Sequence, residues 1–432
     1  MFQALLNRCR DHFAQLPDYR KPSPNLKYTV QDAALSAFAV FLMQSPSFLA
    51  HQRDMQRTKG RNNAQSLFGV QRIPSDNQIR NILDPIAPAH LGDVFWQIYA
   101  QLDTAQLLKT HTGIAGNLLC ALDGVQYFSS QTIACANCTH HQHEETLTYS
   151  HSLIAPVLVA AESPTVFNLE PEFMQPQDGH DKQDCEQAAA KRWLNRHAHR
   201  LPLRRTTILA DDLLCHQPFC EAVRAAQFNF ILVCLPESHV TLYVEIELLA
   251  QAGLLDTLTQ RVWNGRHYET HSYRYTQQVP IRSGADALLV NWCEVTVTHA
   301  QTGERLYQNS FATNFDLCAD TVAAVVRSGR ARWKTENENH NTLKNRGYHL
   351  EHNFGHGQQF LSMLLVALNL LAFLLHTVLL LTDRTAQQVR SALDTYQTFW
   401  GDVRTLTRYF HFQSWAQVFD FTVTQLELAM SP

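Results

Sequence analysis

The sequence predicts an α/β protein: a mixed sheet flanked by helices, interrupted by an antiparallel β insertion and preceded by a helical N-terminal domain. Three observations support this prediction. Apolar residues recur at helical spacing up to residue 112, and apolar strand-like runs interleave with a helix between 113 and 237. Between 238 and 309, aromatic and β-branched residues alternate with polar ones. Residues 310–432 are expected to return to the core and to be mainly helical.

The N-terminal domain, residues 1–112, is predicted from segments such as 29–43, which is apolar at helical spacing. Ser75 precedes Gln78 by three residues, the spacing of a capping box at the start of a helix. This domain is mildly basic. Two roles remain open for it: binding of DNA ends, or protein contacts within an assembly.

The core and the insertion are predicted from strand-like segments bounded by turn residues. In the core, strands are expected at 117–129, 154–160, 206–211 and 228–235, with a helix at 182–198. In the insertion, strands are expected at 240–247, 266–278, 287–300 and 304–315, with turns at Asn264-Gly265 and Thr302-Gly303. Strands interleaved with helices indicate an α/β sheet.

Composition limits the class of protein. The chain has 432 residues, is 45% hydrophobic and 17% charged, and carries a formal net charge of −4. It can therefore bury a large core, and contacts to nucleic acid must come from local basic segments. Residues 191–205 carry six Lys or Arg and no acid, and residues 327–334 carry four more cations. For either segment alone, a solvated helix face is the alternative interpretation.

Ten cysteines and the absence of a secretory leader predict a cytoplasmic protein. Segment 360–381 is nearly free of charge and long enough to span a membrane. Because it contains Asn369 and His376 and has no companion span, we expect a buried core helix and no membrane contact. It would pack the preceding acidic helix against the sheet.

Two aspartates follow apolar runs. Asp123 comes after Leu118–Leu122, and Asp211 comes after Ile208–Ala210, with Asp212 beside it. A charged group at the end of a buried strand requires a partner, a metal or the edge of the sheet. Either aspartate alone is better explained as a strand-end or helix-capping residue.

A third acidic element lies in residues 332–357, where Glu336 and Glu338 accompany several amides and basic residues. Three carboxylates on separate elements, the last on a basic helix, are typical of a two-metal phosphoryl-transfer site. Their joint occurrence therefore favours metal ligands over isolated caps.

These residues resemble the DDE transposases of bacterial insertion sequences, in the subgroup with a β-strand insertion between the second Asp and the Glu. The resemblance runs through segments 73–86, 122–130, 177–194, 208–220 and 332–357. It implies an RNase H-like fold with the first Asp on the first strand, the second on the fourth strand and the Glu on a later helix. It also implies that Asp123, Asp211 and Glu336 hold two Mg²⁺ or Mn²⁺ ions.

The family signature around the glutamate is Tyr, two residues, Arg, three residues, Glu, six residues, Lys. Arg332 and Glu336 keep their step, whereas Gly329 stands at the Tyr position and Lys344 falls one residue late. Glu338 therefore remains a rival to Glu336 as a metal ligand, as Asp212 does to Asp211. The i, i+4 spacing of Arg332, Glu336 and His340 favours Glu336.

The expected partner is double-stranded DNA. Arg332, Lys344, Lys191 and Arg192 are predicted to contact phosphates, with intrahelical pairing to Glu336 as the alternative for the first two. The resemblance implies cleavage of transposon terminal repeats and strand transfer into target DNA, by a homodimer in a paired-end complex. The alternatives are a nuclease that hydrolyses without joining and a catalytically inactive DNA-binding relative.

A second candidate site lies in residues 135–151, where Cys135 and Cys138 have CxxC spacing. Zinc would accept both thiolates and two of the nearby imidazoles of His140, His141, His143 and His151. The short step from Cys138 to the first histidine favours a surface hairpin with incidental histidines instead. The glycines around Glu351 and His356 predict a turn after the acidic helix, with helix capping and no catalytic role.

Overall fold

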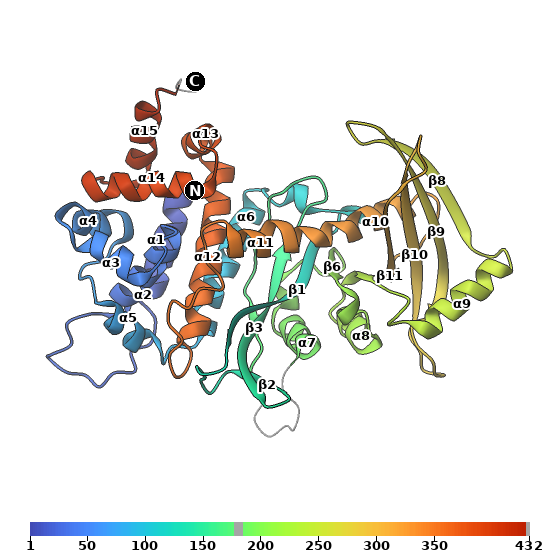
Figure 1. Cartoon of the computed structure of the whole chain (residues 1–432), viewed down its shortest axis with the longest axis horizontal. Coiled ribbons are helices and arrows are strands. Elements are labelled where there is room, and N and C mark those ends of the chain that lie inside the picture. The colour runs from blue at the N-terminus through green and yellow to red at the C-terminus, as the bar shows by residue number, and fades with distance from the viewer. Residues whose placement is uncertain (177–184, 429–432) are drawn as a thin grey trace.

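The computed structural model describes residues 1–176 and 185–428. Figure 1 shows an elongated molecule with helices at one end, a long mixed sheet through the middle and a β extension at the other end. The predicted α/β class is confirmed, because one 11-stranded sheet with flanking helices organises the chain.

The sheet has the strand order β2-β3-β1-β6-β7-β11-β10-β9-β8. Strands β1, β6 and β7 are parallel to one another, whereas β3 pairs antiparallel with β1 and β11 pairs antiparallel with β7. The strands are β1 Leu118–Ser130, β2 Thr139–His143, β3 Thr146–Leu158, β4 Phe167–Asn168, β5 Glu172–Phe173, β6 Thr206–Ala210, β7 Asn229–Val233, β8 Asp256–Trp263, β9 Tyr268–Pro280, β10 Leu289–His299 and β11 Arg305–Thr313.

The helices at the two termini pack together, although they are far apart in sequence (Figure 1). Helix α12 contacts α1, α2 and α5, and α14 contacts α4. The helices are α1 Phe2–Phe13, α2 Val30–Leu42, α3 Phe48–Gln56, α4 Thr58–Asn63, α5 Asp76–Leu83, α6 Gly92–Thr104, α7 Glu186–His197, α8 Gln217–Ala225, α9 Val240–Gln251, α10 Val322–Arg330, α11 Asn341–Asn345, α12 Leu361–Thr382, α13 Arg384–Ala392, α14 Tyr396–Tyr409 and α15 Trp415–Gln425. The Ser75 side chain caps α5 by accepting from the Gln78 N–H, as predicted.

Helix α12 is the apolar segment that is long enough to cross a membrane, and 83% of its most apolar window is buried inside the protein. Two of its polar side chains contact backbone carbonyls: Asn369 Nδ2 donates to the Tyr348 carbonyl at 2.9 Å, and His376 Nε2 lies 2.9 Å from the Leu42 carbonyl. The predicted core helix is therefore present. It packs mainly on the N-terminal helices rather than between the acidic helix and the sheet, although it also contacts β4.

The insertion differs from the prediction in two places. Residues 240–247 form the first part of helix α9 rather than a strand, because Leu242 and Ile246, four residues apart, are its buried positions. The alternation that suggested a strand comes from Val240 and Val244, which are exposed. Strand β8 was not predicted, since this edge strand is polar and mostly exposed.

The β insertion is continuous with the core sheet. Strand β11 pairs antiparallel with β10 on one side and with β7 on the other, so the insertion extends the sheet past β7. The turns expected at Asn264-Gly265 and Thr302-Gly303 do connect β8 to β9 and β10 to β11. The helix expected at 182–198 is α7 from Glu186 onward; residues 182–184 lie outside the described part of the chain.

Candidate functional site

The two predicted aspartates lie side by side at one level of the sheet. The parallel pairing of β1 with β6 ends at Ala121 opposite Leu209, and each aspartate comes two residues after that pair. Asp123 therefore does not end its strand as predicted; it lies in the middle of β1, just beyond the end of the neighbouring strand. Because neighbouring residues in a parallel register share a face, both side chains project the same way.

Glu336 reaches this place from a helical segment that changes type along its length. Helix α10 continues as a 3₁₀ turn, η7 (Ala331–Trp333), then as a π-helix, η8 (Thr335–His340), and ends as α11. The π-turn contacts β1, and η7 contacts β6. π-Helical turns are rare and occur often at functional sites. Here the π-turn places Glu336 and His340 beside β1, the strand that contains Asp123.

The electrostatics of Asp123 identify its charged neighbours. Burial raises the pKa of Asp123 to about 7; Arg332 opposes this shift, and Asp211, Glu336 and Glu186 add to it. Burial likewise raises the pKa of Asp211, again opposed by Arg332. Asp211, Glu336 and Arg332 are therefore near enough to Asp123 for their charges to affect its pKa, and Arg332 is the cation among them.

Glu186 is a fourth carboxylate of this group, and the sequence interpretation missed it. It is the first residue of α7, and burial followed by the charge of Asp211 raises its pKa. Its carboxylate lies against Gly124, so that any side chain at position 124 would collide with it. The glycine directly after Asp123 is the local signal of this close approach.

The two rival ligands point elsewhere. Glu338 lines a separate pocket with Thr342, Arg346 and Tyr396, and it is not one of the largest influences on the pKa of Asp123. Asp212 Oδ1 accepts from the Leu235 N–H at 2.7 Å and lies 3.4 Å from His239 Nε2. Geometry therefore favours Glu336 over Glu338 and Asp211 over Asp212.

His340 lies against the same aspartate. Its Nδ1 is 3.4 Å from Asp123 Oδ2, and burial, followed by Lys344 and Arg332, lowers its pKa to about 4. The imidazole is therefore neutral near pH 7. Its contact with Asp123 orients the carboxylate and does not form an ion pair.

The cations expected to contact DNA are engaged within the protein to different degrees. Arg332 pairs with Glu336 at 2.7 Å, and Lys344 pairs with Glu351 at 2.7 Å. Arg192 Nε lies 2.9 Å from Glu172 Oε1, which is buried. Lys191 lies on α7 and is half-buried.

The negative charge of the four acidic residues suits a divalent cation better than the distances between their carboxylates do. The group contains four half-buried acids and one arginine, and such an excess of like charge is expected to attract a cation. Within the described residues, however, the sets of three or more ligand atoms lying within 4.8 Å of one another are Cys and His groups and not these acids. Glu336 in particular is turned to Arg332.

A basic groove lies along the same helical segment, and none of these four acids lines it. A cleft of about 570 Å³ separates α10 and η7 from β8 and β9, and Arg327, Arg330 and Lys334 line it with the exposed Trp333. The acidic side chain in its lining is Glu162. The predicted basic segment 327–334 thus forms one wall of the groove, although Arg332, within that segment, does not line it.

Cys135 and Cys138 also lie together, but only one of the four histidines expected as possible ligands lies beside them. His151 is beside them, as is His356 from the turn after the acidic helix. His140, His141 and His143 lie on the exposed strand β2. His356, which lies more than two hundred residues further along the chain, was not among the imidazoles considered.

No family model matches this chain, and no curated protein matches it.

The buried charge of Asp123 gives a testable effect on stability. Between about pH 4 and pH 7, Asp123 is protonated in the folded chain but ionised in the unfolded chain. Folding stability is therefore lost as pH rises through this window. Asp123→Asn does not titrate, so in EDTA at pH 8 it should exceed the wild type by about 2–4 kcal/mol in free energy of unfolding.

Urea unfolding of both proteins at pH 5 and pH 8 measures this difference, which should be larger at pH 8. Asp394→Asn, at an exposed position, is the matched control and should change stability equally little at both pH values. An Asp123→Asn protein that was less stable than the wild type at pH 8 would contradict the assignment of a destabilising buried charge.

Proposed function

We propose that this protein is a DDE transposase with an RNase H-like core, which cleaves transposon ends and transfers the cut strand into target DNA. The observation that carries the proposal is the placement of Asp123, Asp211 and Glu336, from three separate elements, in one electrostatic neighbourhood beside Arg332. Three carboxylates so placed suit in-line phosphoryl transfer with divalent metal ions.

The topology supports the RNase H-like core. Strand β1 carries the first Asp, and the second Asp directly follows β6, the fourth strand longer than two residues. The Glu comes from a helical segment after the β extension, in the order that the family resemblance implies. The parallel strands β1, β6 and β7 and the antiparallel β3 form the corresponding mixed sheet.

Each side chain has a role in the proposed reaction. Asp123, Asp211 and Glu336 would hold two Mg²⁺ or Mn²⁺ ions, which supply activation of water or a 3′-hydroxyl and stabilisation of the leaving oxygen. Neutral His340 orients Asp123. Arg332 offers its guanidinium to a phosphate oxygen when Glu336 turns toward the aspartates.

The DNA path is proposed to follow the basic groove. Arg327, Arg330 and Lys334 would neutralise phosphates, and the exposed Trp333 offers a flat apolar surface beside them. Arg330 lies over the Tyr307 ring at 4.3 Å, which fixes its position on the groove wall. The groove would lead double-stranded DNA along α10 to the carboxylates.

The catalytic assignment predicts metal-dependent nicking or strand transfer that Asp123→Ala, Asp211→Ala and Glu336→Ala each reduce by about a thousandfold or more, because the metals contribute several kcal/mol. Glu338→Ala is the matched control, since its carboxylate faces another pocket. It should stay within about twofold of the wild type. Gel assays with Mg²⁺ and circular dichroism of each variant measure activity and fold.

Wild-type activity of Asp123→Ala would refute the assignment. A protein that nicks DNA but never joins a pre-cut end would be a nuclease. A protein that binds ends specifically, without any metal-dependent cleavage, would be an inactive DNA-binding relative.

The groove assignment predicts a change in salt dependence. The double variant Arg327→Ala/Lys334→Ala should weaken DNA binding and reduce the slope of log K against log salt by about 1–2, because each lost phosphate contact removes about 0.9. Glu162→Gln should tighten binding, since it removes the acid from the same groove. Fluorescence anisotropy across a salt series measures both effects.

Arg224→Ala, an exposed cation on α8, provides the comparison and should leave the slope unchanged. Equal slopes for the wild type and the groove double variant would show that DNA does not contact the groove.

A further inference from the structure

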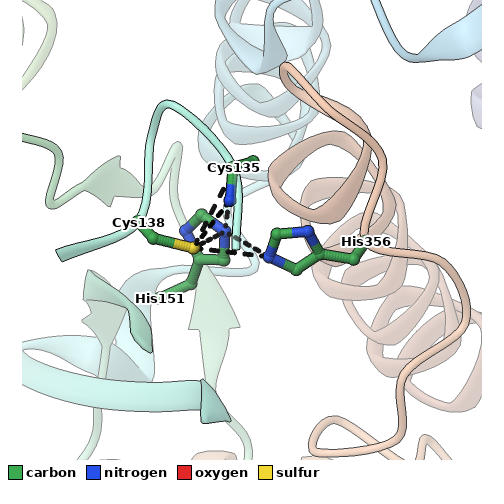
Figure 2. A group of neighbouring side chains, drawn as sticks. All are labelled: Cys135, Cys138, His151 and His356. Atoms are coloured by element: carbon green, nitrogen blue, oxygen red, sulfur yellow. Dashed lines mark hydrogen bonds between the residues drawn. The ribbon is translucent and has the colours of Figure 1, made fainter. Parts of the chain in front are cut away.

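Four metal-binding side chains from two distant parts of the chain converge on one point. Cys135 and Cys138 lie in the connection between β1 and β2, His151 lies on β3, and His356 lies in the loop before α12. Figure 2 shows the Cys138 sulfur, the His151 imidazole and the His356 imidazole close to one another, with Cys135 beside them. All of these residues except Cys135, which is half-buried, are buried.

The separations of the ligand atoms match a tetrahedron. Around a zinc ion with ordinary bond lengths, two sulfurs lie about 3.8 Å apart, a sulfur and a nitrogen about 3.6 Å, and two nitrogens about 3.4 Å. The two Sγ atoms here are 3.9 Å apart, and the two Nε2 atoms are 3.2 Å apart. Three sulfur–nitrogen separations are each 3.4 Å.

The surroundings fix the ligands in the state that a metal requires. His356 Nδ1 lies 3.1 Å from the Gly357 carbonyl, and because a carbonyl only accepts, this nitrogen carries the proton. His356 Nε2 is then an unprotonated lone pair facing the centre. The Cys135 N–H donates to Cys138 Sγ at 3.4 Å, which favours a thiolate. The Tyr127 ring stacks on His151, and the Phe128 ring packs on His356.

Hydrogen bonding alone does not account for this group. His151 Nε2 has three heteroatoms within 3.4 Å: both sulfurs and His356 Nε2. That nitrogen has either one N–H or one lone pair, so it can make one good hydrogen bond, whereas three heteroatoms face it. A cation at the centre satisfies all four at once.

We propose that Cys135, Cys138, His151 and His356 bind one zinc ion. The set has four protein ligands and leaves no open position, so the site is structural rather than catalytic. Thiolate and imidazole ligands also exclude Mg²⁺, which prefers oxygen. This inference stands whether or not the proposed DNA chemistry is correct.

The ion would connect the β1–β3 hairpin to the loop before α12. The same two segments already touch, since Asn137 Nδ2 donates to the Gln359 carbonyl at 2.7 Å. Gln358, Gln359 and Leu361 in turn donate their N–H groups to Asp84 at the end of α5. Zinc would thus complete a junction of hairpin, loop and N-terminal helices, and its binding energy would contribute to folding.

Metal analysis of the full chain, purified without a His tag, tests the proposal. The wild type should contain about one equivalent of zinc, and Cys135→Ser/Cys138→Ser and His356→Ala should each fall below about a tenth. The variant His140→Ala/His141→Ala/His143→Ala is the matched control, because these exposed imidazoles are close in sequence but outside the group. It should keep its zinc, as should Cys318→Ser.

A measurement on the unmodified chain covers the case in which the ligand variants fail to fold. Replacement with Co²⁺ should give tetrahedral d–d bands together with a thiolate-to-metal charge-transfer band. Zinc below about a tenth of an equivalent in the wild type, with no such cobalt spectrum after reconstitution, would overturn the proposal. Retention of zinc by Cys135→Ser/Cys138→Ser, with loss in Cys215→Ser, would also overturn it, because Cys215, Cys234 and His239 form another buried group.

Discussion

The constraint on which the candidate site depends is the early end of the parallel pairing between β1 and β6. Past Ala121 and Leu209, β1 continues while β6 stops, so one side of β1 loses its neighbouring strand. Asp123 and Asp211 occupy this opening at the same level. The backbone thereby places two acids side by side in a largely buried place, where each raises the cost of ionising the other.

The remaining parts of the site can be understood as responses to that concentration of charge. Arg332 contributes one positive charge. It lies on a helical segment whose π-turn changes the directions in which the side chains of Glu336 and His340 point. His340 stays neutral beside Asp123, so it adds a polar contact without further charge. A single arginine does not balance four acids. The excess of negative charge favours the binding of an additional cation.

Local patterns predicted those features whose causes are local. The parallel core strands, the α5 cap and the buried nature of α12 follow from apolar runs, a Ser–Gln step and the length of an uncharged segment. The prediction of a strand at 240–247 was wrong, because Val240 and Val244 are apolar but exposed. The alternation of apolar and polar residues there did not reflect burial. Glu186 and His356 could not be found this way. Their partners are distant in sequence, and only the folded chain shows that Glu186 covers Gly124 and that His356 meets His151.

The carboxylate group and the proposed zinc group share the same supports. Asp123 lies on β1, and the zinc ligand His151 lies on β3 opposite Phe128 of β1, so one hairpin carries both. The segment with Glu336 continues through α11 into the loop that ends at His356. That loop is held by Tyr348, whose carbonyl accepts from Asn369 and whose hydroxyl lies 2.6 Å from His376 Nδ1. Fixing His356 to β3 therefore gives this segment a second attachment to the sheet, in addition to the contact of η8 with β1. A chain that holds repelling acids together needs such a rigid frame, because the acids themselves favour separation.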